Sequence, residues 1–193
     1  MKPLVIFEMA NNHMGNLSHA KSIIAKYYQL SKKFRNTISF AIKFQYRDSK
    51  TFIHESFLSS DDKQIQRFKT TFFSRAKWRK IILFSKSKFK LICTPFDEIS
   101  VKNVIKDKFD YLKIASCSAT DWPLLETVAK KIKKRNIICS LGGANKNEIS
   151  NVISFFSTRN LNAKFLYCVA KYPTPPKDLN LIYFQELKNL YGD

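Results

Sequence analysis

Two lysines sit inside short apolar segments of this chain, in surroundings that suggest an anion site. Lys43 lies in the segment ISFAIKFQ (38–45), and Lys113 lies in YLKIAS (111–116). Continuous apolar runs of this length are typical of buried parallel strands. A lysine is costly to bury there unless a negative group neutralises it. Because parallel α/β proteins bind ligands at the carboxyl ends of their strands, the two segments predict an anion held at one end of a parallel sheet.

Polar side chains also end the other apolar segments. A serine or threonine commonly ends a strand without binding anything, so each of these residues taken alone is structural. Their recurrence in phase with the strands favours a binding rim, at which hydroxyls, lysines and the backbone N–H groups near Gly142-Gly143 bind a phosphate and a carboxylate. Besides the two lysines, the strand-end residues are Glu8, Gln45, Thr94, Ser116, Ser140 and, after the last strand, Tyr172.

The positioning elements alternate along the chain. Asn16 or Ser18 is a suitable N-cap for the first helix, and Pro123 suits the first turn of a later one. The segment 46–74 is a polar excursion, partly helical and long enough for a lid or substrate loop. The pattern predicts strands at 3–8, 38–44, 90–94, 110–115, 136–140 and 163–168, and helices at 17–33, 75–88, 97–107, Pro123–Arg135, 145–157 and 181–190.

Six strands alternating with helices predict parallel βα units with right-handed crossovers. A closed (β/α)₈ barrel normally takes about 250 residues, and this chain has 193. We therefore expect an α/β fold in which residues 1–193 form one domain, an incomplete TIM-type (β/α) barrel of about six βα units. An open doubly wound sheet is the alternative. It explains the length better but leaves the strand-end polar groups less obviously convergent.

Composition limits the function further. No apolar run approaches the length of a membrane span, and the first apolar stretch is too short for a secretory signal, so we expect a soluble, cytoplasmic protein without membrane partners. The formal net charge is +19, yet the lysines are dispersed over predicted helices and no nucleic-acid-reading module is evident, so we expect no nucleic-acid partner. The four cysteines have neither CxxC nor Cys/His spacing, which predicts structural thiols.

Six short motifs resemble those of the sialic acid (N-acetylneuraminate) synthase family, in its order and spacing. The resemblance covers nearly the whole chain, from Val5 to about Asn180. It implies a transferase of carbohydrate biosynthesis that condenses phosphoenolpyruvate with an N-acyl amino sugar, N-acetylmannosamine or a related sugar, to a nonulosonic acid plus phosphate. The motifs are EMANNHMG (8–15), KFQ (43–45), TPFD (94–97), KIAS (113–116), PLL (123–125) and YPTP (172–175).

The resemblance also implies roles for individual residues. Glu8 falls where the family places a carboxylate near the sugar and the reacting carbons, and Tyr172 falls among the sugar-contacting residues. In the family, C3 of phosphoenolpyruvate attacks the sugar aldehyde, water adds at C2, and phosphate leaves by C–O cleavage. The expected catalytic residues are Glu8, Lys43 and Lys113, and the expected substrate-binding residues are Thr94, Ser116, Ser140, Tyr172, Gln45 and Asn12.

A divalent metal, Mn²⁺ or Mg²⁺, polarises the aldehyde in the family. The family's metal-binding histidines and its C-terminal antifreeze-like domain lie beyond the point corresponding to Asp193, so we expect no metal ligand in this chain. His13 is expected to order the first βα loop rather than to bind metal. Cys117 and Ser118 stand where the family usually has glycine and an acidic residue. The sugar side of the site therefore departs from the family more than the anion side does.

Three hypotheses follow. The first is a synthase-type transferase. The second is a catalytically inactive phosphoenolpyruvate- or phosphate-binding remnant, or one half of a split synthase. The third is a basic nucleic-acid-binding protein with an incidental barrel pattern. Because six strands leave two open edges, we also expect a homo-oligomer or pairing with a complementary fragment.

Overall fold

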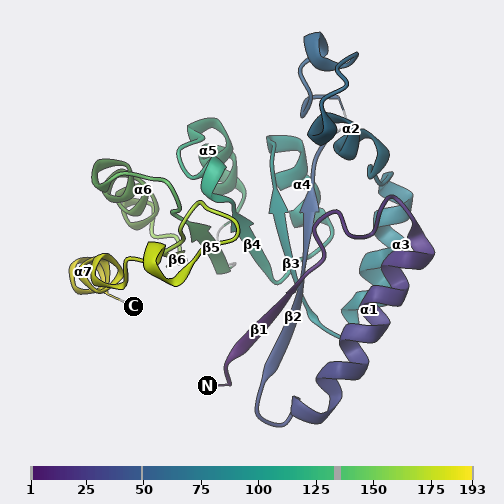
Figure 1. The fold of residues 1–193 in the computed structure, drawn as a ribbon, viewed down its shortest axis with the longest axis horizontal. Helices are drawn as coiled ribbons and strands as arrows, with labels where there is room; N and C mark the ends of the chain where they lie inside the picture. Colours follow the sequence, from purple (N-terminus) through teal and green to yellow (C-terminus); the bar gives the residue numbers. More distant parts are fainter. Residues whose placement is uncertain (1, 49, 133–135, 193) are drawn as a thin grey trace. The chain divides into compact units, whose positions relative to one another are not determined.

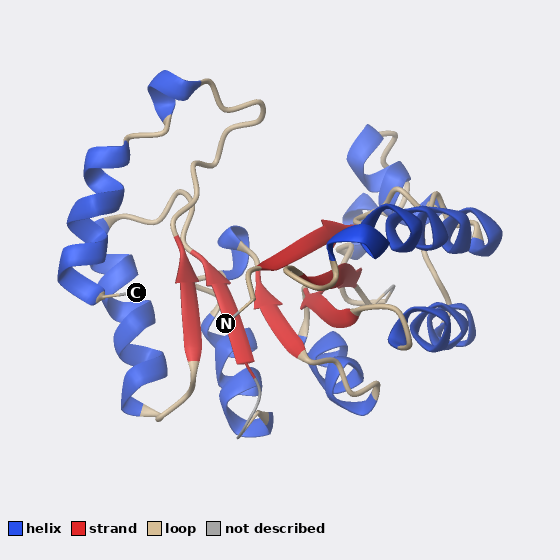
Figure 2. Cartoon of the chain, turned by 90° about the horizontal axis from the view of Figure 1, so that it is seen from below, coloured by secondary structure: helices blue, strands red, loops and turns tan. Residues whose placement is uncertain are grey.

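Strands and helices alternate along the chain in the computed structural model, which describes residues 2–48, 50–132 and 136–192 (Figures 1 and 2). The strands are β1 (Leu4–Glu8), β2 (Ser39–Tyr46), β3 (Lys90–Pro95), β4 (Tyr111–Ile114), β5 (Asn136–Ser140) and β6 (Ala163–Leu166). The helices are α1 (Leu17–Ser31), α2 (Lys63–Thr70), α3 (Arg75–Lys86), α4 (Glu98–Lys106), α5 (Trp122–Lys131), α6 (Lys146–Thr158) and α7 (Leu181–Tyr191).

The sheet order decides between the two predicted architectures. The strands follow one another in chain order from β1 to β6, and the pairs β1–β2, β2–β3, β3–β4 and β5–β6 are parallel. A doubly wound sheet reverses its strand order at a switch point, whereas successive units of a (β/α) barrel do not. The doubly wound alternative is therefore wrong, and the strand order is that of a TIM-type barrel.

The predicted element boundaries agree closely with the structure. Asn16 caps α1 by accepting a hydrogen bond from the backbone N–H of His19, and Pro123 lies in the first turn of α5, as expected. The helix predicted to reach Arg135 ends earlier, at Lys131, because Ile132 adopts an extended conformation; residues 133–135 lie outside the described part. The sixth strand ends at Leu166 rather than at 168.

The chain divides into two compact units, residues 1–112 and 113–193, and each is described by itself. In the first unit, α1 contacts α3, and both α3 and α4 contact β3. Trp78 of α3 packs against two side chains of β2, edge-on to Phe44 (ring centroids 5.7 Å apart) and tilted against Tyr46 (4.9 Å). Phe44 is fully buried, so this aromatic contact forms the core between strand and helix.

A polar contact fixes the same layer. The Tyr46 hydroxyl donates to Asp107 Oδ2 (2.8 Å), and Arg75 Nη2 lies 2.7 Å from the same oxygen. Burial raises the pKa of Tyr46, and the neighbouring Cys93 and Asp107 add to the effect, so the phenol remains protonated and donates. The three side chains tie β2 to α3 and to the end of α4.

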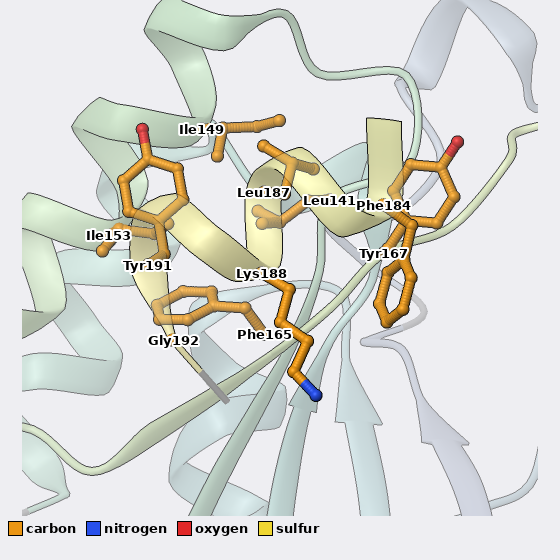
Figure 3. Close-up of a pocket in the computed structure, with 10 residues that line it drawn as sticks. All are labelled: Leu141, Ile149, Ile153, Phe165, Tyr167, Phe184, Leu187, Lys188, Tyr191 and Gly192. Atoms are coloured by element: carbon orange, nitrogen blue, oxygen red, sulfur yellow. The ribbon is translucent and has the colours of Figure 1, made fainter. Parts of the chain in front are cut away.

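In the second unit, β5 pairs with β6, and β6 packs against α6, with Phe156 of α6 and Phe165 of β6 at 5.9 Å between ring centroids. A cavity of about 280 Å³ lies beside this contact, between α6, β6 and α7 (Figure 3). No residue of α7 is buried. The lining of the cavity is mainly apolar and includes Leu141, Ile149, Ile153, Phe165, Phe184 and Leu187.

The cysteines are free thiols. Cys93 and Cys139 are buried, Cys168 is half-buried and Cys117 is exposed, which agrees with structural roles for those in apolar runs. No helix within the described ranges is long and apolar enough to cross a membrane.

Candidate active site

Strand register brings the polar residues of the first unit onto one face of β1–β3. Glu8 is the register partner of Lys43, and Gln45 is the partner of Thr94. Side chains alternate between faces along a strand, and register partners in neighbouring strands share a face. These four residues therefore lie on one face near the carboxyl ends of their strands. The neighbouring Phe44 and Tyr46 point the other way, into the helix layer.

The centre of this group is an ion pair between Lys43 Nζ and Glu8 Oε2. The Lys43 side chain is only 11% exposed, whereas the Glu8 side chain is 41% exposed. The backbone N–H of Ala10 donates to Glu8 Oε1 (2.9 Å), and the N–H of Met9 donates to the Lys43 carbonyl (2.9 Å). The negative group expected near the buried lysine is thus a carboxylate of the neighbouring strand.

Thr94 has the most unusual environment of the group. Its side chain is 2% exposed, and its Oγ1 has no hydrogen-bond partner among the described residues. A buried hydroxyl without a partner is destabilising and rare in folded proteins. Because it shares its face with Lys43, it is suited to donate to an anion held by that lysine.

The loop after β1 is ordered by His13, as predicted. The His13 ring is 2% exposed, stacks on Phe73 at 4.2 Å between centroids, and accepts the Gly15 N–H at Nδ1 (3.1 Å). Burial, together with the charges of Arg47, His19 and Lys77, lowers the pKa of His13 to about 4. The imidazole is therefore neutral at pH 7 and acts as a buried acceptor.

Arg47 is a residue of this site that the sequence did not reveal. Its guanidinium donates to Gln45 Oε1 (2.6 Å) and to Asn11 Oδ1 (3.3 Å). It also lies 4.5–5.2 Å from the ring centroids of three aromatic side chains, two of them in the 46–74 excursion: Phe52, Phe68 and Phe96. Arg47 thus joins the first βα loop, β2 and the excursion. The phenylalanines in that otherwise polar segment were the sequence feature that could have indicated a buried partner for Arg47.

The second unit has its own polar group at the ends of β4 and β5. The Ser116 Oγ accepts the Gly142 N–H at 3.2 Å, and Ser140 is 3% exposed. A Cβ on Gly142 would lie 3.0 Å from both Ser116 Oγ and Cys168 Cβ, so a side chain there would crowd its neighbours. Lys113 is half-buried in β4. Burial raises the pKa of Cys139 to about 12, against the opposing effect of the Lys113 charge.

The two remaining predicted residues are exposed. The Tyr172 side chain is fully exposed in the turn after β6, and Asn12 is exposed in the first βα loop, where Asn11 rather than Asn12 makes the contact with Arg47. Neither packs into the buried polar groups. The first unit thus brings Glu8, Lys43, Gln45 and Thr94 together on one face, and in the second unit Ser116 contacts Gly142.

The described residues do not form a metal site. Within 2–48, 50–132 and 136–192, no three His, Cys, Asp or Glu side chains come together in a way that could hold an ion. The donor set on these residues therefore does not fit a divalent metal, and we assign no step to one.

The arrangement resembles known proteins over the entire chain. A model of the NeuB family matches residues 36–193. N,N'-diacetyllegionaminic acid synthase from Campylobacter jejuni is 31% identical over 98% of this chain and 58% of its own length. The chain spans little more than half the length of the curated relatives it matches.

Two solved structures match equally widely. Spore coat polysaccharide biosynthesis protein E from Chromobacterium violaceum is 42% identical with a TM-score of 0.91, covering 98% of this chain and 56% of that one. N-acetylneuraminic acid (sialic acid) synthetase from Leptospira borgpetersenii, solved with citrate, is 27% identical with a TM-score of 0.83, covering 100% and 63%. With the chain-order parallel strands, these matches confirm the predicted α/β fold, an incomplete TIM-type barrel of six βα units.

Proposed function

Because this chain belongs to the NeuB family, we propose that it is a nonulosonic acid synthase-type transferase, or the part of one that binds phosphoenolpyruvate. The reaction would join phosphoenolpyruvate to an N-acyl amino sugar and release phosphate. The observation that carries the proposal is the buried Lys43, paired with a carboxylate and sharing its face with the unpartnered Thr94 hydroxyl. A fixed cation beside an unused donor is what a phosphate or carboxylate requires.

In the first unit, Lys43 and Thr94 would bind oxygens of the trianionic substrate. The phosphate carries more charge than the Glu8 carboxylate, so Lys43 can turn toward the substrate while Glu8, which is the more exposed partner, turns toward the sugar. Glu8 would there orient a sugar hydroxyl or the incoming water. Gln45 is held by Arg47 and would present its amide N–H₂ group.

In the second unit, Lys113, Ser116 and Ser140 would bind substrate oxygens. Ser116 Oγ already accepts the Gly142 N–H, which leaves its own O–H free to donate. Asn12 and Tyr172 are exposed and would contact only the sugar.

The proposed bond changes are those that the family resemblance implies. The C3 carbon of phosphoenolpyruvate forms a bond to the sugar aldehyde carbon as the C2–C3 π bond breaks, and the aldehyde oxygen takes up a proton. Water adds at C2 and gives up a proton, and cleavage of the C2–O bond then releases phosphate and leaves a ketone at C2. The lysines and hydroxyls keep the phosphate and carboxylate in place and stabilise the charge that develops on the departing phosphate. In the family a divalent metal polarises the aldehyde, and the residues described here supply no ligands for it.

Phosphate release from phosphoenolpyruvate, measured with N-acetylmannosamine and Mn²⁺, tests this function. We expect release by the wild-type chain and its loss in Lys43→Met and Lys113→Met, each of which keeps most of the side-chain volume. Lys26→Met, at an exposed position of α1, is the matched control. Release that survives both site substitutions would exclude the assigned residues.

A phosphoenolpyruvate-binding protein without synthase activity is the second candidate, favoured because Asn12 and Tyr172, which were expected to contact the sugar, are both exposed, whereas Lys43 and Thr94 are buried. It predicts a rise in Tm with phosphoenolpyruvate, abolished by Lys43→Met, without any product. If phosphoenolpyruvate shifts no Tm and yields no phosphate, both candidates fail.

A further inference from the structure

A strongly basic groove lies at the opposite ends of the strands from the candidate site. It has a volume of about 480 Å³ and lies within the first unit, beside Ser39 and Lys90, where β2 and β3 begin, and beside Asp110, which precedes β4. The candidate site uses the carboxyl ends of the same strands. Six cations line the groove against one carboxylate: Lys2, Arg35, Lys86, Lys88, Lys90 and Lys108.

Arg35 is rigidly built into this groove. Its Nη2 donates to the Lys88 carbonyl (2.6 Å) and to Ser31 Oγ (3.1 Å), and its Nε donates to the same hydroxyl (3.3 Å). The guanidinium also lies over the rings of Tyr28 (4.6 Å) and Phe89 (5.3 Å). Its Nη1 has no acceptor among the described residues, so the fixed guanidinium retains free N–H donors.

The other cations are not neutralised by the protein. None of the six forms an ion pair within the described ranges. Lys2 and Lys88 donate only to carbonyl oxygens, which leaves their charge uncompensated. The Asp110 carboxylate accepts the backbone N–H of Leu91 (2.7 Å). The groove therefore concentrates positive charge around a preorganised arginine, which attracts a multiply charged anion.

We propose that this groove binds a ligand with two or more linked phosphates, such as the phosphate chain of a nucleotide or an inorganic oligophosphate. A volume of 480 Å³ exceeds what one phosphate fills and lies in the usual range of small-molecule sites. Arginine binds phosphate through its planar fork, and the lysines add point charges around it. Ile38 is half-buried and offers a small apolar contact for a nucleobase, whereas Phe40 and Phe89 are buried. Nucleic acid would instead need a track of cations that continues beyond the groove.

Isothermal titration of the chain with tripolyphosphate, ATP and orthophosphate tests the proposal. We expect tripolyphosphate to bind more tightly than orthophosphate. A tighter binding of ATP than of tripolyphosphate identifies a nucleotide, and equal binding identifies the phosphate chain alone as the ligand. The substitutions Lys86→Gln, Lys90→Gln and Lys108→Gln together should weaken tripolyphosphate binding by about tenfold or more.

The control is an equal change of charge elsewhere in the same unit. Lys26→Gln, Lys63→Gln and Lys102→Gln remove three exposed cations that do not line the groove, and should leave binding unchanged. An equal loss in both triple variants, or no preference over orthophosphate, would overturn the proposal, because either result reports general charge attraction. Single-stranded RNA that binds in proportion to its length and is not displaced by tripolyphosphate would also overturn it. The groove triple variant should weaken tripolyphosphate binding equally in the wild-type and Lys43→Met backgrounds, which separates this test from that of the proposed function.

Discussion

Protonation of His13 should weaken the fold as the pH falls from 7 to 5. The pKa of His13 is lowered from 6.5 to about 4 in the folded chain by burial and by nearby cations. Between these two values the unfolded chain binds a proton that the folded chain does not, so stability is complete above pH 6.5 and is lost progressively as the pH falls toward 4. The loss is about 2 kcal/mol at pH 5 relative to pH 7, since each pKa unit corresponds to about 1.4 kcal/mol.

The expected loss of stability has a specific structural cause at His13. A proton on Nδ1 would break the hydrogen bond from the Gly15 N–H and place a charge against the Phe73 and Trp78 rings, away from water. The free energy of unfolding, measured in urea by tryptophan fluorescence at pH 7 and pH 5, gives the pH-dependent loss. His13→Phe keeps the ring packing but cannot be protonated, so it should be less stable than wild type at pH 7 and lose about 2 kcal/mol less on going to pH 5.

His54→Gln is the control, because His54 is exposed in the 46–74 excursion. It should lose as much stability as wild type over the same pH range. If His13→Phe also shows the wild-type loss, titration of His13 does not govern the acid sensitivity, and its neutral role in the first βα loop is wrong.

Three further substitutions test other contacts by the same urea unfolding. Thr94→Val removes a buried hydroxyl without a described partner, so stability should hold or rise by about 1 kcal/mol while phosphoenolpyruvate binding weakens; a clear destabilisation would mean that the hydroxyl is already bonded. Tyr46→Phe removes the donor to Asp107 and should cost about 1 kcal/mol, and an unchanged stability would contradict that bond. Gly15→Ala should cost about 2 kcal/mol or more, because φ is +68° and the new Cβ would lie 2.5 Å from the Thr70 carbonyl oxygen; a neutral result would rule out this close approach.

The fold was largely predictable from the sequence, because its signals are local. Apolar runs of strand length, N-caps such as Asn16 and the proline in the first turn of α5 each depend on neighbouring residues only. The boundaries that differed, at Lys131 and Leu166, lie where the chain leaves a regular element without a strong stop signal.

The candidate site was predictable only in its residue types. Lys43 was expected near an anion and Glu8 near the sugar, but their pairing depends on register between two strands about thirty-five residues apart. The binding of Asn11 and Gln45 by Arg47 likewise depends on how the 46–74 excursion folds back. The metal, sugar and oligomer expectations remain predictions.

The separation of faces in β1–β3 has a consequence for how such proteins diverge. The polar positions Glu8, Gln45 and Thr94, which we propose contact substrate, lie on the opposite face from core positions such as Phe44 and Tyr46, so a substitution on one face leaves the packing of the other intact. Mutations that retune ligand choice therefore carry little penalty in stability, while the aromatic layer evolves under a separate constraint. A chain built in this way can change its ligand preference by a few strand-end substitutions without first needing compensating changes in its core.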